Sequence, residues 1–159
     1  MKTCLKWILG AFVVVFAVLQ LTNPPRTNPA APAGDDVMAT NPPPQQIATI
    51  LQGACYDCHS DKTRWPWYAH VAPMSWLLAS DVRNGRRHVN FSEWPHGDAD
   101  RAARLWEDIR DEVDYNDMPP VQYKLMHPPA RLTAAQRQEL IQWADQEAKR
   151  LKTVAAAAK

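Results

Sequence analysis

The sequence predicts an all-α fold, in which a small helical domain follows an apolar N-terminal helix. Glycine is scarce, with 5 residues among 159, whereas good helix formers such as Ala, Leu, Arg, Glu and Gln are frequent. In several segments apolar residues recur three and four positions apart, which is the period of one helix face. No segment shows the strand–helix–strand rhythm that a parallel sheet would require.

The first predicted helix is the apolar stretch within residues 1–22. Lys2 and Lys6 precede an uncharged run from Trp7 to Leu21, and a positive start followed by an apolar run is typical of export signals. The run is at the short end of the range for a membrane-spanning helix, about 17–25 residues. Because no small-x-small cleavage site follows it, an uncleaved anchor is favoured over a signal peptide. The lysines would then stay in the cytoplasm, which predicts a single-pass membrane protein with its domain on the outer side of the membrane.

Residues 23–41 are predicted to form a proline-rich linker. Half of the 14 prolines fall in residues 23–44: Pro24, Pro25, Pro29, Pro32, Pro42, Pro43 and Pro44. Such a composition favours an extended, semi-rigid spacer over a packed core. The folded domain is then expected at residues 42–152, and an Ala-rich tail at 153–159.

Four helices are predicted within the domain. The first begins at Asn41 as N-cap, with Pro42 at the first helical position, and leads into a cysteine motif. The second begins at Pro73 and ends near Asn84-Gly85, which is a C-cap type of sequence. The third covers about residues 100–113 and the fourth begins at Thr133. Their buried stripes include these residues: Ala102, Leu105, Trp106, Ile109 and Val113 in the third, and Leu140, Ile141, Ala144, Ala148 and Leu151 in the fourth.

The cysteine motif, Cys55-Tyr56-Asp57-Cys58-His59, carries the clearest chemistry in the chain. Two cysteines three residues apart, followed directly by a histidine, are the attachment signature of c-type haem. On a helical turn the two thiols lie on nearly the same face, so each can add across one vinyl group of the porphyrin. The imidazole of His59 can then bind the iron from one side. The motif therefore predicts one covalently attached haem c.

Two other interpretations of the cysteine pair stay open. A thioredoxin-like redox dithiol also uses Cys-x-x-Cys, but next to a βαβ pattern that this sequence lacks. A structural zinc site needs two further Cys or His ligands at matching spacing. The only other cysteine is Cys4, in the apolar segment, and the remaining histidines are scattered: His70, His88, His96 and His127. Haem attachment is therefore the favoured interpretation.

The second axial ligand decides whether a haem iron transfers electrons or binds a small molecule. Met118 is the favoured candidate because it precedes Pro119-Pro120, directly after the third helix. A residue before a proline is pushed into an extended conformation, so the thioether is presented from a stiff loop. The alternatives have less distinctive settings: Met74, Met126, His70 and His127.

Further stretches accompany the motif, at residues 63–68, 72–76, 85–94, 118–120 and 132–133, together with Trp143. With them the chain, over roughly residues 45–145, resembles the haem-binding domain family of bacterial c-type cytochromes, which is related to class I cytochrome c. The resemblance implies a mostly helical domain with thioether bonds at Cys55 and Cys58. It also implies His59 as the proximal ligand and Met118 as the distal ligand. A further hypothesis is that one fixed donor binds the haem propionates: Arg64, Trp67 or Arg86.

These observations predict an electron carrier, and not an enzyme, that is tethered to the bacterial inner membrane with its haem domain in the periplasm. Its partners would be redox proteins, which it meets through small, transient contacts. A formal charge of +1 does not predict nucleic-acid binding, and the acidic residues between 107 and 114 indicate a solvated helix face. Two other functions stay open. One is a haem-based sensor with a labile sixth ligand, and the other is a domain in which haem serves only as a structural staple.

Overall fold

The computed structural model describes residues 2–30 and 34–158, and every regular element within these ranges is a helix. The elements follow one another in this order: α1 (Lys2–Gln20), α2 (Val37–Thr40), α3 (Gln45–Ala54), α4 (Tyr56–His59), the 3₁₀ helix η1 (Trp67–His70), α5 (Met74–His88), η2 (Phe91–Glu93), α6 (Ala99–Asp114), α7 (Val121–Met126), η3 (Pro128–Ala130) and α8 (Ala134–Ala157). The prediction of an all-α fold is confirmed.

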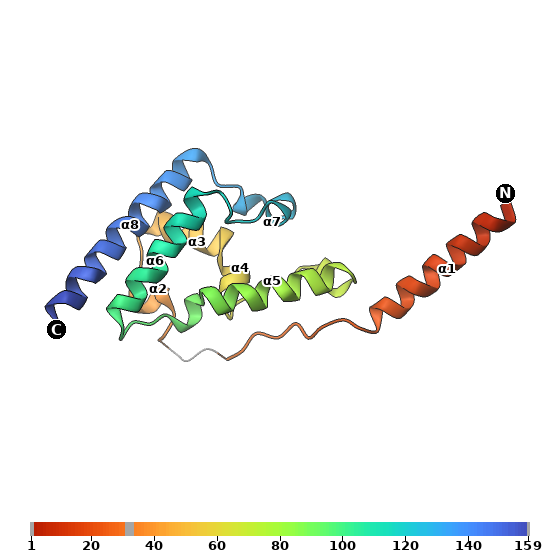
Figure 1. Cartoon of the computed structure of the whole chain (residues 1–159), viewed down its shortest axis with the longest axis horizontal. Helices are drawn as coiled ribbons and strands as arrows, with labels where there is room; N and C mark the ends of the chain where they lie inside the picture. The colour runs from red at the N-terminus through yellow and green to blue at the C-terminus, as the bar shows by residue number, and fades with distance from the viewer. Residues whose placement is uncertain (1, 31–33, 159) are drawn as a thin grey trace.

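Helices α6 and α8 pack side by side and run in opposite directions along one side of the domain (Figure 1). The Asp98 side chain caps α6 by accepting a hydrogen bond from the Arg101 amide, at 2.9 Å. The predicted capping box of Thr133 and Gln136 begins α8. The facing stripes are buried, as the apolar periodicity predicts: Ala102, Trp106, Ile109 and Val113 on α6, and Leu140, Ala144 and Ala148 on α8.

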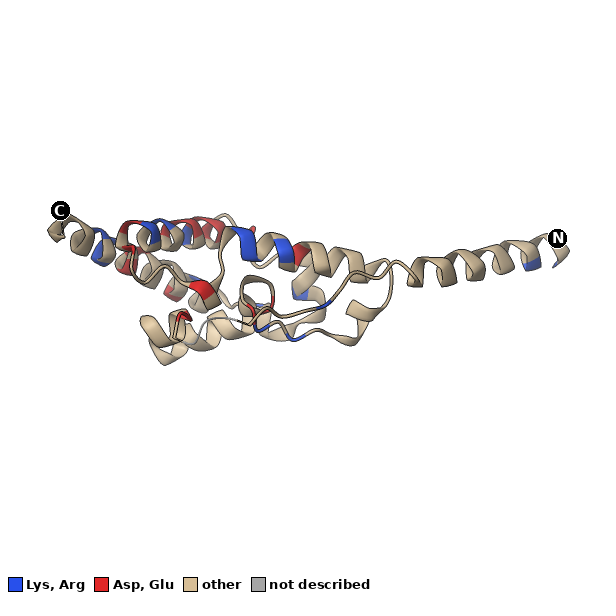
Figure 2. Cartoon of the chain, turned by 90° about the horizontal axis from the view of Figure 1, so that it is seen from below, with Lys and Arg blue, Asp and Glu red and all other residues tan. Residues whose placement is uncertain are grey.

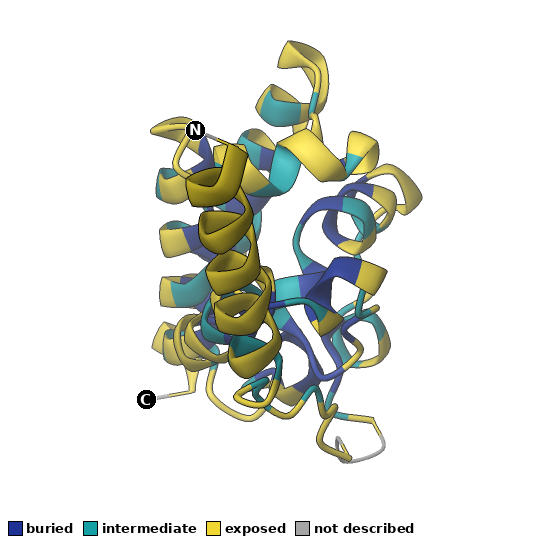
Figure 3. Ribbon diagram, turned by 90° about the vertical axis from the view of Figure 1, so that its right-hand side faces the viewer, coloured by how far each residue is buried: buried dark blue, intermediate teal, exposed yellow. Residues whose placement is uncertain are grey.

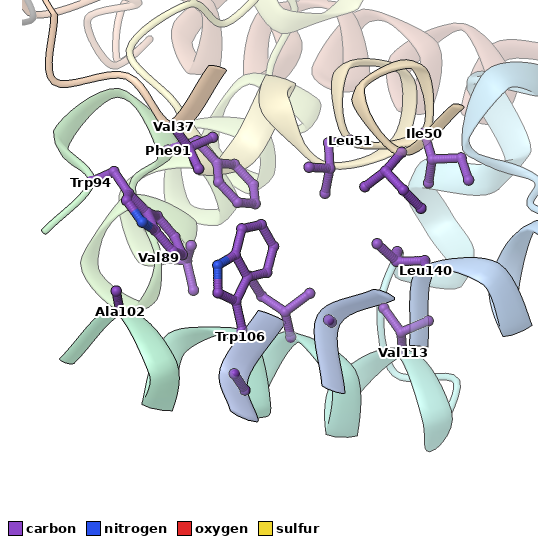
Figure 4. Close-up of a cluster of buried hydrophobic side chains, with 14 of the residues drawn as sticks. Val37, Ile50, Leu51, Val89, Phe91, Trp94, Ala102, Trp106, Val113 and Leu140 are labelled. Atoms are coloured by element: carbon purple, nitrogen blue, oxygen red, sulfur yellow. The ribbon is translucent and has the colours of Figure 1, made fainter. Parts of the chain in front are cut away.

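An aromatic cluster fills the core between this helix pair and the rest of the domain (Figure 4). Trp106 is fully buried, and its ring centroid lies 4.7 Å from those of both Trp94 and Trp143. Phe91 continues the cluster and stacks on Tyr56 at 5.0 Å. Because Tyr56 belongs to the cysteine motif, the core directly supports the motif helix α4.

The first helix of the domain begins at Gln45, so the predicted start at Asn41-Pro42 is wrong. Pro42 and Pro43 each precede another proline, and that position disfavours the α conformation. The helix can therefore begin only after Pro44, which occupies the N-cap position.

Two helices continue beyond their predicted ends. α5 runs through Asn84-Gly85 to His88. Gly85 does not end the helix, because it lies inside α5 where the helix packs closely against the Cys58 backbone. α8 continues to Ala157, so the segment predicted as a tail is helical from residue 153 to residue 157. The predicted bounds of α6 agree with the structure to within one residue at each end.

No residue of α1 is buried (Figure 3), and the helix projects from the domain (Figure 1). By length and composition it could cross a membrane. Residues 20–28, which we call the strap, lie along the domain; for example, the Asn28 Nδ2 donates to the Thr63 carbonyl at 2.9 Å. Further along the predicted linker, Val37 is fully buried in the core. Residues 31–33 of that linker, and residues 1 and 159, lie outside the described residues.

Candidate haem-binding site

The predicted attachment residues lie on one turn of backbone, where α3 leads into α4. The amides of Cys58 and His59 both donate to the Cys55 carbonyl oxygen, at 3.2 and 2.9 Å. This turn brings the two thiols to one side, as their spacing predicts. All three side chains are half-buried, and neither thiol forms a disulfide.

Helix α5 crosses this turn at Gly85. A methyl group on the Gly85 Cα would lie 2.6 Å from the Cys58 carbonyl oxygen and 3.0 Å from its carbonyl carbon. Both distances are shorter than normal van der Waals contacts, so only glycine allows the two backbones to approach so closely. Gly85 therefore fixes the position of the motif against α5, and the helix end predicted at this glycine is wrong.

The backbone after α5 orients the His59 ring. Its Nδ1 lies 3.2 Å from the carbonyl oxygen of Val89, so that a proton on Nδ1 leaves the Nε2 lone pair for a metal. Burial lowers the pKa of His59, although the nearby carbonyls of Val89 and Gly85 partly offset this effect. The neutral imidazole, which is the form that binds iron, is thereby favoured.

The two thiols differ from those of a redox-active dithiol. Burial, with a smaller contribution from the neighbouring Cys58, raises the pKa of Cys55 to about 12. Burial, together with the charges of Asp81 and Asp57, raises the pKa of Cys58 to about 12 as well. Redox-active Cys-x-x-Cys pairs instead depend on a lowered thiol pKa. Residues 2–30 and 34–158 also contain no group of three or more Cys, His, Asp or Glu side chains placed to hold a metal ion, so the geometry supports neither the dithiol nor the zinc interpretation.

An open cleft adjoins Cys58 and is lined mainly by apolar and aromatic side chains. One wall comes from η1 and α5 and the other from the segment around α7: Tyr68, Met74, Leu77, Leu78 and Val82 face Pro120, Tyr123, Met126 and His127. A mainly apolar lining with a few polar groups is typical of sites that take up a flat apolar cofactor.

Comparison with known proteins agrees with this geometry. A family model described as a haem-binding domain matches residues 14–146. The chain belongs to the haem-binding domain family. The matched region takes in the end of α1 and the strap as well as the packed domain. No curated protein and no solved structure matched the chain.

The haem-binding domain anchors both residues that separate the two cysteines. The Tyr56 hydroxyl donates to Asp36 at 2.8 Å. Asp57 is buried and accepts hydrogen bonds from Arg64 Nε and Nη2, both at 3.0 Å, and from the Tyr123 hydroxyl at 2.8 Å. Burial disfavours the charge on Asp57, but these hydrogen bonds and the Arg64 charge outweigh it, so the pKa of Asp57 is lowered. The bond to Tyr123 joins the motif to the α7 wall of the cleft.

No sequence pattern distinguishes Asp57 or Tyr123 as functional residues. The only signal for them in the sequence is a carboxylate inside a buried motif, since a buried charge must have partners. The identity of those partners depends on the tertiary fold.

Met118 is not among the residues that line the cleft. It is partly exposed and borders a separate cavity with Val113 and Arg137. Its amide donates to the Glu112 carbonyl, at 3.1 Å, after a left-handed residue, Asn116, that ends α6. Other side chains with iron-binding atoms line the cleft instead: Met74, Met126 and His127. Met118 as distal ligand therefore stays a prediction, with these residues as its alternatives.

The hypothesis on the haem propionates fits one of its three donors. Arg86 directs its guanidinium into the protein, toward the Ser60 carbonyl at 2.8 Å and the Thr63 hydroxyl at 2.9 Å. Trp67 is exposed and does not line the cleft. Arg64 does line the cleft, but its Nε and Nη2 already donate to Asp57, so its role toward the propionates stays a prediction.

The residues present fit a haem. The motif supplies two thiols and one oriented imidazole on a single turn, and the cleft that adjoins Cys58 is lined mainly by apolar and aromatic side chains.

Proposed function

We propose that this chain is a membrane-tethered c-type cytochrome with one haem, which carries single electrons on the periplasmic side of a bacterial inner membrane. The supporting observation is the turn that carries Cys55, Cys58 and His59, held against Gly85 beside the apolar cleft. Cys55 and Cys58 would hold the haem through thioether bonds, each thiol adding its sulfur to one carbon of a vinyl group and its hydrogen to the other. Bound haem would supply an iron that changes between the ferrous and ferric states.

The remaining roles follow from the same arrangement. His59 Nε2 would bind the iron, and α1 is the membrane anchor in this proposal, with Lys2 and Lys6 on the cytoplasmic side. Redox proteins are the partners in this proposal, and no enzymatic step is assigned to the chain.

The optical spectrum and the mass of the full chain, produced in a host with haem-maturation machinery, test this proposal. We expect a c-type spectrum, a mass increased by one haem, and reversible voltammetry. The double variant Cys55→Ser/Cys58→Ser should carry no covalent haem, whereas Cys4→Ser should be loaded like the parent. A colourless parent whose mass equals that of the bare polypeptide would contradict covalent attachment, and irreversible voltammetry would contradict electron transfer.

Spectra of three methionine variants test which residue is the sixth ligand of the haem iron. Ligation by Met118 predicts a weak far-red band in the oxidised protein that disappears in Met118→Ala and persists in Met126→Ala and Met74→Ala. Loss of the band in one of the other variants instead would transfer the role to that residue.

The alternative function, a haem-based sensor or small-ligand-binding domain with a labile sixth ligand, is tested with carbon monoxide. If the sixth position is labile, the reduced protein should bind carbon monoxide promptly. An electron carrier with a full coordination sphere should not bind it.

A further inference from the structure

The exposed apolar side chains of the packed domain are concentrated in two segments. Among the described residues after Leu21, every exposed large apolar residue except Val154 falls within 67–77 or 115–126. Residues 65–80 also contain no Asp, Glu, Lys or Arg. Figure 2 shows that the first turns of α5, beside α1, carry no charged residue, whereas charges crowd along the helices toward the C-terminal end. Apolar patches of this kind mark interaction sites.

The haem cleft accounts for only part of this surface. Met74, Leu77 and Met126 line the cleft, so bound haem would cover them. Six others lie outside the lining. Two of them, Tyr115 and Met118, belong to the loop after α6, and we call the other four the cleft rim: Trp67, Trp76, Val121 and Leu125. Trp67 is 74% exposed, Val121 67% and Leu125 69%. A ligand in the cleft does not explain their exposure.

The two tryptophans of the cleft rim lie at the same end of the domain as Val121 and Leu125. The Tyr68 hydroxyl lies 3.2 Å from His127 Nε2, which joins η1 to the residue that follows α7. Val121 and Leu125 are four positions apart and share one face of α7. Figure 1 shows α7 and the start of α5 at the end of the domain from which α1 departs.

Hydrogen bonds attach the end of α1 to this rim. The Gln20 Oε1 accepts from the Ala72 amide at 2.9 Å, and the Trp76 Nε1 donates to the Thr22 carbonyl at 3.1 Å. The position of the rim relative to α1 is therefore fixed by direct contacts, and not by a flexible linker.

The length of α1 indicates where these contacts would lie relative to the bilayer. Its 19 residues extend about 28 Å at 1.5 Å per residue, close to the hydrocarbon thickness of about 30 Å. If α1 spans the bilayer, Gln20 lies at the hydrocarbon boundary, and its partner Ala72 lies in the adjoining headgroup layer. Tryptophan is enriched in that layer because its ring is apolar while its N–H is polar.

We propose that the cleft rim docks on the lipid headgroup layer, so that the haem domain lies on the membrane surface with its rim against the bilayer. This inference rests on the proposed function, in which α1 spans the membrane. The uncharged 65–80 segment and the exposed tryptophans favour lipid as the occupant, and the contacts of Gln20 and Thr22 bring the rim to the required depth.

Nitroxide accessibility in the full, haem-loaded chain tests the docking. In a Cys4→Ser background, single labels are placed at Trp67→Cys, Leu125→Cys, Leu21→Cys and Val154→Cys, in nanodiscs of phosphatidylcholine and phosphatidylglycerol with reduced haem. Leu21 reports on the anchor. Val154 is the matched control, because it is also an exposed apolar residue but lies on the last turns of α8. An unchanged haem spectrum verifies that each variant is folded.

Oxygen concentrates in lipid, whereas a water-soluble nickel chelate stays in water. We therefore expect the electron spins of the labels at 21, 67 and 125 to relax faster with oxygen than with the chelate, and the label at 154 to show the reverse. Labels at 67 and 125 that match 154, while 21 remains lipid-accessible, would overturn the docking and leave the anchor intact. This is also the outcome expected if a redox protein, and not lipid, covers the rim. A water-exposed label at 21 would overturn the anchor together with the docking.

Discussion

The two sides of the domain differ in how they complete their packing. On the α6–α8 side, the core closes within the chain around the fully buried Trp106, and the exposed faces are paired by Arg110–Asp145 and Lys152–Glu107 ion pairs. On the cleft side, apolar residues of α5 and α7 face an open cleft, and hydrogen bonds such as Asp57–Tyr123 connect its walls. From this difference we expect bound haem to stabilise the cleft side more than the α6–α8 side.

The largest expected difference in the free energy of unfolding is between variants of two tryptophans, one from each side of the domain. Trp106→Ala removes a ring that contacts three other aromatic rings, so we expect a loss of about 3–5 kcal/mol in the free energy of unfolding. Trp67→Ala removes an exposed ring and should change it by less than about 0.5 kcal/mol. Denaturation of the full chain in detergent, followed by circular dichroism, measures both variants.

Similar losses for the two variants would contradict this comparison. They would mean that the exposed face contributes as much to folding as the aromatic core does.

Gly85→Ala tests the contact between α5 and the motif. In an ordinary helix interior, alanine is favoured over glycine by about 1 kcal/mol. Here the added methyl group meets the Cys58 backbone, so we expect the opposite sign, a loss of about 1–3 kcal/mol from overpacking, and less covalent haem per chain. Gly97→Ala is the matched control, because no atom lies within 4 Å of the added methyl group.

A Gly85→Ala variant that is as stable as the parent, with full haem content, would show that α4 can move away from α5 at little cost. The motif would then not be held in place by this crossing.

The same contrast explains which parts of the fold could be predicted from the sequence. The α6 and α8 stripes and their caps are local patterns, so the bounds of α6 and the start of α8 at Thr133 followed directly from spacing. The Asn84-Gly85 pair was misinterpreted because a helix end and a close crossing both favour glycine. Only the position of Cys58 in space distinguishes the two.

The candidate site was likewise predictable where its chemistry is local. Cys55, Cys58 and His59 stand within five residues, so their common turn could be inferred. The cleft walls come from segments far apart in the sequence, and the Asp57–Tyr123 bond joins residues 66 positions apart. No spacing rule indicates such a pair, and for the same reason the sequence could not decide between Met118 and the methionines that line the cleft.

Asp57→Asn tests the connection between the cleft walls. The variant keeps most of the shape but weakens charge-assisted hydrogen bonds from Arg64 and Tyr123, so we expect a loss of about 1–2 kcal/mol. Tyr123→Phe removes a single hydrogen bond and should cost about 0.5–1.5 kcal/mol. Hydrogen exchange should quicken in α7 in both variants while α6 and α8 stay protected. Faster exchange throughout the domain would show that the two sides unfold together.

The smallest effect is expected at the surface of the α6–α8 side. Lys152 pairs with Glu107 at 2.6 Å, but its side chain is 52% exposed, so water and salt screen the attraction. Lys152→Ala should cost less than about 1 kcal/mol, and added salt should reduce the difference further. A loss as large as that of Trp106→Ala would mean that charge pairing, and not the aromatic core, holds α6 against α8. The two sides would then differ mainly in the number of ion pairs that hold them together, and not in how completely their apolar residues are packed.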